Sequence, residues 1–291
     1  MANGHSGDVR FSRAPSGSAT EIRLEIGRRK YFPRDIESVS RSFWWLNRYL
    51  NGRTPVQFYF DQGKKGHLLP DDDSISALKD YVRKHKQNSG LDYGNEAIFS
   101  NFDTAYFYRN FLKCLIAAHH LQTAFPDLLD APLVIDIGCG VGTFGIACWL
   151  MHSFPQAEFV LLDQHKYQLH VARYLVDSLR APKFSFIRNN AFREFGQPGL
   201  RVSSYWLCCN RDSVLNKGDA ELAMLLRDGL VLIDYKTNIE AFIDRIAPLR
   251  PEMKRIEIEA PLPKEMRTFV GSRDITVHML FVDRLVPSQN I

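Results

Sequence analysis

Three glycines at alternate positions follow an acidic residue in an apolar stretch of this chain. The glycines are Gly138, Gly140 and Gly142, and Asp136 stands two positions before the first of them. Glycine tolerates positive φ angles and leaves room for a ligand to approach the backbone N–H groups. The helix predicted over residues 143–152 directs its positive N-terminal end toward the same space. This pattern predicts a loop that binds a cofactor.

Two kinds of cofactor fit the glycines. Gly140, Gly142 and Gly145 match G-x-G-x-x-G, the pattern of loops that hold the pyrophosphate of a dinucleotide. Asp136 weighs against a dinucleotide, because its negative charge would oppose a nearby pyrophosphate. The same charge suits a ligand that carries an ammonium and a sulfonium group.

The pattern D-x-G-x-G-x-G, from Asp136 to Gly142, resembles that of the class I S-adenosylmethionine-dependent methyltransferases. The resemblance covers roughly residues 105–284 and implies an α/β fold, with a Rossmann-like sheet of seven strands whose last strand is antiparallel. It further implies an enzyme that uses S-adenosylmethionine. In this family the acid that ends the second strand binds the ribose hydroxyls, a role that falls to Asp163, and Asn190 would bind the adenine amino group. The full set of implied cofactor contacts is Asp136, Gly138, Gly140, Gly142, Asp163, Gln164, Asn190, Ala191 and Asn210.

Hydrophobic runs place the remaining elements of this region. Strands are expected at residues 133–137, 159–163, 184–188, 204–210, 229–234, 253–260 and 275–282, with a helix at 220–227. The fourth of these strands lacks the N-P-P-[YFW] motif that follows it in enzymes that methylate base or glutamine amide nitrogens. That absence argues against those subclasses.

The first hundred residues are expected to form an accessory region. Residues 1–20 are rich in Gly, Ser and Ala and predict a flexible tail. Residues 21–104 are expected to form an α+β accessory domain or lid that recognises the substrate, and residues 105–291 the cofactor-binding domain. Within the accessory domain we expect strands at 21–27 and 56–60 and helices at 34–50 and 73–86, before a long helix within 95–125.

Direct transfer from a sulfonium requires alignment more than acid–base chemistry, and a base is needed only if the acceptor must lose a proton. Candidate catalytic residues are His165, Asn210 and Asp212, which follow predicted strands. Tyr106, Tyr108 and Arg109 precede the first strand of the predicted cofactor fold, where this fold commonly places substrate contacts. They are the candidate substrate residues.

The charge, the hydropathy and the cysteine pattern of the sequence limit the classes of protein to which this chain could belong. The chain has 37 Lys and Arg residues and 33 Asp and Glu residues. Residues 1–128 hold 18 of the basic and 14 of the acidic residues, so the whole net charge of +4 comes from this N-terminal part. No apolar run is long enough to cross a bilayer. The five cysteines form no C-x-x-C pair, which favours reduced thiols in the cytoplasm and no metal site.

The slight charge excess and the absence of a recognised RNA-binding module favour a small organic acceptor. Two alternatives stay open. One is an RNA methyltransferase that uses the basic N-terminal part, and the other is a non-catalytic protein that binds the cofactor.

Overall fold

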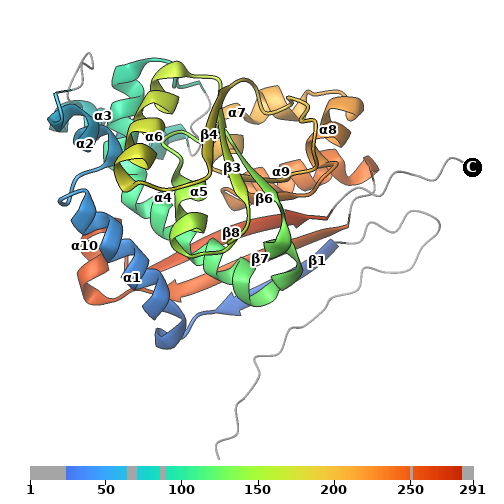
Figure 1. The fold of residues 1–291 in the computed structure, drawn as a ribbon, viewed down its shortest axis with the longest axis horizontal. Coiled ribbons are helices and arrows are strands. Elements are labelled where there is room, and N and C mark those ends of the chain that lie inside the picture. The colour runs from blue at the N-terminus through green and yellow to red at the C-terminus, as the bar shows by residue number, and fades with distance from the viewer. Residues whose placement is uncertain (1–23, 64–70, 86–89, 250–251, 284–291) are drawn as a thin grey trace, which may run out of the picture.

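The computed structural model describes residues 24–63, 71–85, 90–249 and 252–283, and the expected tail at 1–20 lies outside them. A single mixed sheet lies between layers of helices (Figure 1). Its order is β1-β7-β8-β6-β5-β2-β3-β4. β8 runs antiparallel to both of its neighbours, and all other pairs are parallel. The strands are β1 (Leu24–Lys30), β2 (Leu133–Ile137), β3 (Glu158–Asp163), β4 (Phe184–Arg188), β5 (Leu200–Ser204), β6 (Leu230–Ile233), β7 (Met253–Pro261) and β8 (Asp274–Val282).

This topology confirms the expected fold class, a Rossmann-like methyltransferase sheet with an antiparallel last strand. The expected number of strands, seven, was wrong, because eight strands of the described residues form the sheet. The additional strand, β1, pairs in parallel with β7, from Leu24 opposite Met253 to Lys30 opposite Glu259. A strand that sequence analysis placed in an accessory domain therefore extends the main sheet.

Helices cover both faces of the sheet because its central strands are apolar on both. In β2, Val134 packs into the core shared with α1, α4, α5 and α6, whereas Leu133, Ile135 and Ile137 pack into the core shared with α7, α8 and α9. The helices are α1 (Pro33–Tyr49), α2 (Pro55–Asp61), α3 (Asp72–His85), α4 (Glu96–Ala124), α5 (Thr143–Leu150), α6 (Lys166–Leu179), α7 (Trp206–Leu215), α8 (Asp219–Leu226), α9 (Lys236–Ile246) and α10 (Arg267–Val270).

The boundary expected between residues 104 and 105 falls inside α4, which begins at its cap Asn95 and runs to Ala124. Phe43 of α1 stacks on Phe111 of α4, at 6.4 Å between ring centroids. The N-terminal helices thus share a core with the sheet. A separate role for residues 21–104 in substrate recognition stays a prediction.

Two expected strands are helical. Residues 56–60 lie in α2, because Thr54 caps the helix by accepting a hydrogen bond from the Gln57 N–H and Pro55 occupies its first turn. The strand expected at 204–210 ends at Ser204 as β5, and the chain then turns into α7. The other expected helices and strands of the described region are present, with ends shifted by a few residues.

Candidate functional site

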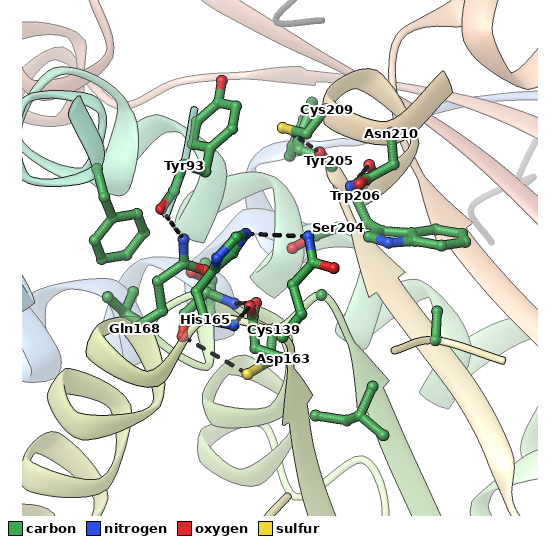
Figure 2. Close-up of a pocket in the computed structure, with 18 of the residues that line it drawn as sticks. Tyr93, Cys139, Asp163, His165, Gln168, Ser204, Tyr205, Trp206, Cys209 and Asn210 are labelled. Atoms are coloured by element: carbon green, nitrogen blue, oxygen red, sulfur yellow. Dashed lines mark hydrogen bonds between the residues drawn. The ribbon is translucent and has the colours of Figure 1, made fainter. Parts of the chain in front are cut away.

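A cavity of about 360 Å³ opens at the carboxyl ends of β2, β3 and β5. Parallel α/β sheets bind ligands at this edge. Figure 2 shows Tyr93 and Gln168 on one side of the cavity, Tyr205, Cys209 and Asn210 across from them, and Asp163 below. The lining comes from the loop before α4, α4 itself, the glycine loop, the ends of β3 and β4, and the segment from Ser204 to Lys217.

The three glycines of the loop all adopt positive φ, at 60° for Gly138, 56° for Gly140 and 81° for Gly142. Their surroundings differ. A Cβ on Gly138 would lie 2.3 Å from the Trp206 ring, and one on Gly142 would lie 2.8 Å from Leu161. A Cβ on Gly140 would meet only Phe99, at 3.9 Å, which is an ordinary van der Waals distance. Gly138 and Gly142 therefore allow close packing, whereas the Cβ position of Gly140, a residue of the cavity lining, is uncrowded.

Asp163 ends β3 and lines the cavity, with 5% of its surface exposed. Its Oδ2 accepts a hydrogen bond from the Gly140 N–H at 3.1 Å, and its Oδ1 accepts one from the His165 N–H at 2.9 Å. Burial raises the pKa of this carboxyl. The backbone N–H groups of His165, Gly140 and Gln164 act against this rise by stabilising the ionised carboxyl.

Asp136 lies beneath the glycine loop and outside the cavity lining. It is 1% exposed, and its Oδ2 accepts a hydrogen bond from the Gly145 N–H at 2.9 Å. Its Oδ1 has no hydrogen-bond partner among the described residues. Burial raises the pKa of Asp136 to about 7. Through this hydrogen bond, Asp136 stabilises the start of α5.

Besides Gly138, Gly140, Asp163 and Asn210, four predicted residues lie in the cavity wall: Gln164, His165, Asn190 and Ala191. The Gln164 amide nitrogen lies 3.1 Å from His165 Nε2. Asn190 Oδ1 accepts a hydrogen bond from the Phe192 N–H at 2.9 Å, which fixes the turn after β4. The structure therefore brings the predicted ribose and adenine contacts to one wall.

Some of the candidate residues for catalysis and substrate binding line the cavity, and others lie outside it. Asn210 lines the cavity from within α7, where its amide donates to the Trp206 carbonyl at 2.9 Å, and His165 lies on the opposite wall. Asp212 is exposed on α7, and Arg109 is exposed on α4. Neither is part of the cavity lining, and the same holds for Tyr106.

Tyr108 points away from the cavity. Its hydroxyl donates to the Arg53 carbonyl at 2.5 Å, and its ring packs 5.6 Å from that of Phe43. Its position fixes the segment between α1 and α2 against α4.

Sequence analysis missed Asp103, a wall residue from α4 that is 4% exposed. Its Oδ2 accepts a hydrogen bond from the Val56 N–H at 3.1 Å, and burial raises its pKa to about 7. The available signal was an acid among Phe99, Phe102 and Phe107 on one helix. Charged side chains are almost never fully buried unless they are paired or have a function.

Tyr205 and Trp206, at the turn after β5, were also missed as wall residues. Tyr205 is buried and has a φ of 58°, a strained conformation for a residue with a side chain. Asp234, at the end of the neighbouring β6, stabilises this turn by accepting a hydrogen bond from the Cys208 N–H at 3.0 Å. Strained backbone in a cavity wall is typical of functional sites.

The charge of the lining is unbalanced. Among the described residues it contains Asp92, Asp103 and Asp163, whereas Lys217 is its one lysine and no arginine belongs to it. Lys217 is paired with Glu221 at 2.8 Å. The cavity thus favours a positively charged ligand.

Within the described residues, no group of three or more metal-ligating side chains comes together, and no helix has the length and apolarity needed to span a bilayer. All five cysteines are free thiols.

No protein family model and no curated protein sequence matches the chain. Several solved methyltransferases are similar to it in fold. Precorrin-6y C5,15-methyltransferase from Geobacter metallireducens is 12% identical over 62% of this chain and 89% of that one, with a TM-score of 0.42. Human N-acetylserotonin methyltransferase is 16% identical over 72% and 66%, with a TM-score of 0.40. Magnesium protoporphyrin IX methyltransferase from Synechocystis is 13% identical over 76% and 99%, with a TM-score of 0.37.

Proposed function

We propose that this chain is an S-adenosylmethionine-dependent methyltransferase acting on a small organic acceptor. The observation that carries the proposal is the pairing of Asp163 with Gly140. Asp163, a buried carboxylate of the cavity wall, accepts the N–H of Gly140, a glycine of the same wall whose Cβ position is uncrowded. This pair provides acceptors for ribose hydroxyls next to a backbone that a ligand can contact.

The residues present fit this cofactor. Asp163 would hold the ribose, and Asn190, Ala191 and Gln164 would surround the adenine. Asp103 lies on the α4 side of the cavity, where a carboxylate suits the ammonium group of the cofactor. When bound, the cofactor supplies a methyl group on a positively charged sulfur.

The protein's own contribution is alignment and exclusion of water. Aromatic side chains of α4, Phe99 and Phe107, cover the glycine loop from one side, while Tyr205 and Trp206 close the other. Fixing two reactants in line can supply about 7–11 kcal/mol of a reaction barrier. A role for His165, Asn210 or Asp212 in proton transfer stays a prediction.

An acceptor of small size is favoured because side chains from α4, the loop before it and α7 line a cavity of about 360 Å³. An RNA acceptor would predict affinity that falls steeply with salt, since phosphate contacts release counterions. Binding assays at two salt concentrations distinguish the two acceptors.

Calorimetric titration with S-adenosylhomocysteine tests the proposal. Asp163→Ala is expected to weaken binding by about ten- to a hundredfold, because a hydrogen bond to a charged group contributes about 1.5–3 kcal/mol. Asp177→Ala, an exposed acid on α6, is the matched control and is expected to leave binding unchanged. Unchanged affinity in a folded Asp163→Ala protein would refute the assignment.

A further inference from the structure

The outer edge of β1 has no partner among the described strands. β1 stands first in the sheet order and pairs with β7 alone (Figure 1). The Tyr31 N–H donates inward to β7, and in a parallel pair alternate residues bond to the same neighbour. Gly27 therefore bonds to β7, whereas Ile26 and Arg28 direct their N–H and C=O groups outward. Such an edge is a template for another strand.

The middle of β1 is also open to the approach of a second backbone. Ile26 is 46% exposed, although it is a large aliphatic residue. A Cβ on Gly27 would meet nothing within 4 Å, and its φ lies outside the left-handed region. A glycine inside a strand often marks a place where another backbone comes close.

The sequence of β1 is complementary to itself in one antiparallel register. A two-fold axis through Gly27 places Glu25 of one copy opposite Arg29 of the other, twice. In the same register Ile26 lies opposite Arg28, and these outward-facing residues can exchange both backbone hydrogen bonds. A register centred on Arg28 would instead oppose this arginine to itself. Unlike charges that face each other across strands are stabilising, and like charges are destabilising.

The present contacts of Glu25 and Arg29 leave both accessible. Glu25 lies 3.3 Å from Lys254, and its side chain is 54% exposed. Arg29 lies 3.3 Å from His120 Nδ1 and 3.9 Å from Asp35, and its side chain is 33% exposed. Positions 25 and 29 point to the same face of the sheet, because side chains alternate along a strand. Both opposed pairs therefore form on that one face.

We propose that the chain forms a symmetric dimer in which the β1 strands of two copies pair antiparallel about Gly27, so that one sheet continues through both subunits. The partner is a second copy, because the complementary charges belong to the same strand. Arg28 and Lys30 have the positive charges that commonly protect an edge from unselective pairing. In this register they lie opposite the aliphatic side chains of Ile26 and Leu24. The inference is independent of the proposed function, since no residue of β1 lines the cavity.

Sedimentation velocity from about 1 to 100 µM tests the dimer and its charge pairs. The wild-type protein is expected to dimerise in this range. Glu25→Arg and Arg29→Glu, each alone, oppose like charges and are expected to weaken the dimer by at least about tenfold. An equimolar mixture of the two variants opposes unlike charges in both pairs and is expected to restore it. Asp177→Lys, on α6 at the other end of the sheet, is the control for charge reversal and is expected to leave the dimer unchanged.

Disulfide crosslinking tests the register. In the proposed dimer the two Gly27 Cα atoms form a non-hydrogen-bonded pair about 4.5 Å apart, which a disulfide can span. Gly27→Cys is therefore expected to give a covalent dimer on mild oxidation with glutathione disulfide, as seen on a non-reducing gel. Lys30→Cys is the matched control, because its two copies would lie roughly 20 Å apart and should not crosslink.

The contrary outcomes are equally distinct. A wild-type protein that sediments as a monomer over the whole range overturns the proposal, and so does a dimer that both charge reversals leave intact. Crosslinking through Lys30→Cys but not through Gly27→Cys would show another register and would overturn it as well. None of these results bears on S-adenosylhomocysteine binding, which the proposed function predicts for monomer and dimer alike.

Discussion

Gly138 and Gly140 share a left-handed backbone, yet their replacements should have different effects. Gly138→Ala places a Cβ against the Trp206 ring, so it should lower the free energy of unfolding by several kcal/mol. Gly140→Ala has only the left-handed strain, about 1–2 kcal/mol. Its new methyl group, however, occupies the space that the proposed cofactor needs. We expect Gly140→Ala to fold and to lose most affinity for S-adenosylhomocysteine.

Denaturant unfolding and calorimetric titration of both variants measure these two effects separately. A Gly140→Ala protein with wild-type affinity would show that the ligand does not approach this backbone. Equal destabilisation by the two substitutions would contradict the assignment of Gly138 to packing.

Asp136 should make stability depend on pH. Burial raises its folded-state pKa to about 7, above the unfolded value near 3.9, so between these values the folded protein holds a proton that the unfolded chain has lost. Its contribution to stability therefore decreases as pH rises through this window and levels off above pH 7. Asp136→Asn removes the titration while its side-chain oxygen can still accept the Gly145 N–H bond.

The measurement is the difference in unfolding free energy between Asp136→Asn and wild type at pH 5 and at pH 7.5. We expect the variant to gain on the order of 2 kcal/mol relative to wild type at the higher pH. The comparison cancels the opposite trend from His120, whose pKa burial lowers to about 4. An unchanged difference would mean that Asp136 is ionised throughout.

Sequence analysis correctly predicted the helices and strands whose pattern of apolar residues matches the environment they have in the fold. The glycine loop, its flanking β2 and α5, and Asp163 at the end of β3 all follow from local pattern and order. The turn after β5 does not, because Tyr205 adopts a glycine-like backbone and the turn is held by Asp234, an acid 29 positions further along the chain. A tertiary contact of this kind has no local signal.

α2 and Tyr108 illustrate the same limit. The aromatic, strand-like run in α2 is helical because a cap at Thr54 and a proline at the first turn outweigh its β propensity. Tyr108 lies on the same helix as the wall residue Phe107, but one residue changes direction by about 100° along a helix. Being next to Phe107 in the sequence therefore does not direct the Tyr108 side chain into the cavity.

β1 is attached to the rest of the fold through Tyr31, which follows it directly. The Tyr31 N–H donates to the Glu259 carbonyl at 2.8 Å, and its buried hydroxyl lies 3.2 Å from the Ile116 carbonyl and 3.0 Å from His119 Nδ1, both on α4. Tyr31→Phe removes the hydroxyl and its hydrogen bonding, so it should lower the unfolding free energy by about 0.5–1.5 kcal/mol. Affinity for S-adenosylhomocysteine should not change, since Tyr31 is not part of the cavity lining. A loss of affinity would link β1 to the site.

The molecule as a whole has one sheet and two packed faces, and its N-terminal helices contribute to one of those faces. Phe43 of α1 also contacts Phe269 of α10, with ring centroids 5.9 Å apart, so the core joins residues from both ends of the described chain.

This shared core predicts that the protein unfolds in a single calorimetric transition, because α1 and α4 cannot separate without exposing buried aromatic rings. S-adenosylhomocysteine at 100 times its dissociation constant should stabilise the folded state by about 2.7 kcal/mol and raise the midpoint by roughly 5–10 °C. The whole transition should move, since ligand and core belong to one cooperative unit. Two transitions, with only the second shifted by ligand, would instead show that the N-terminal region folds as a separate unit.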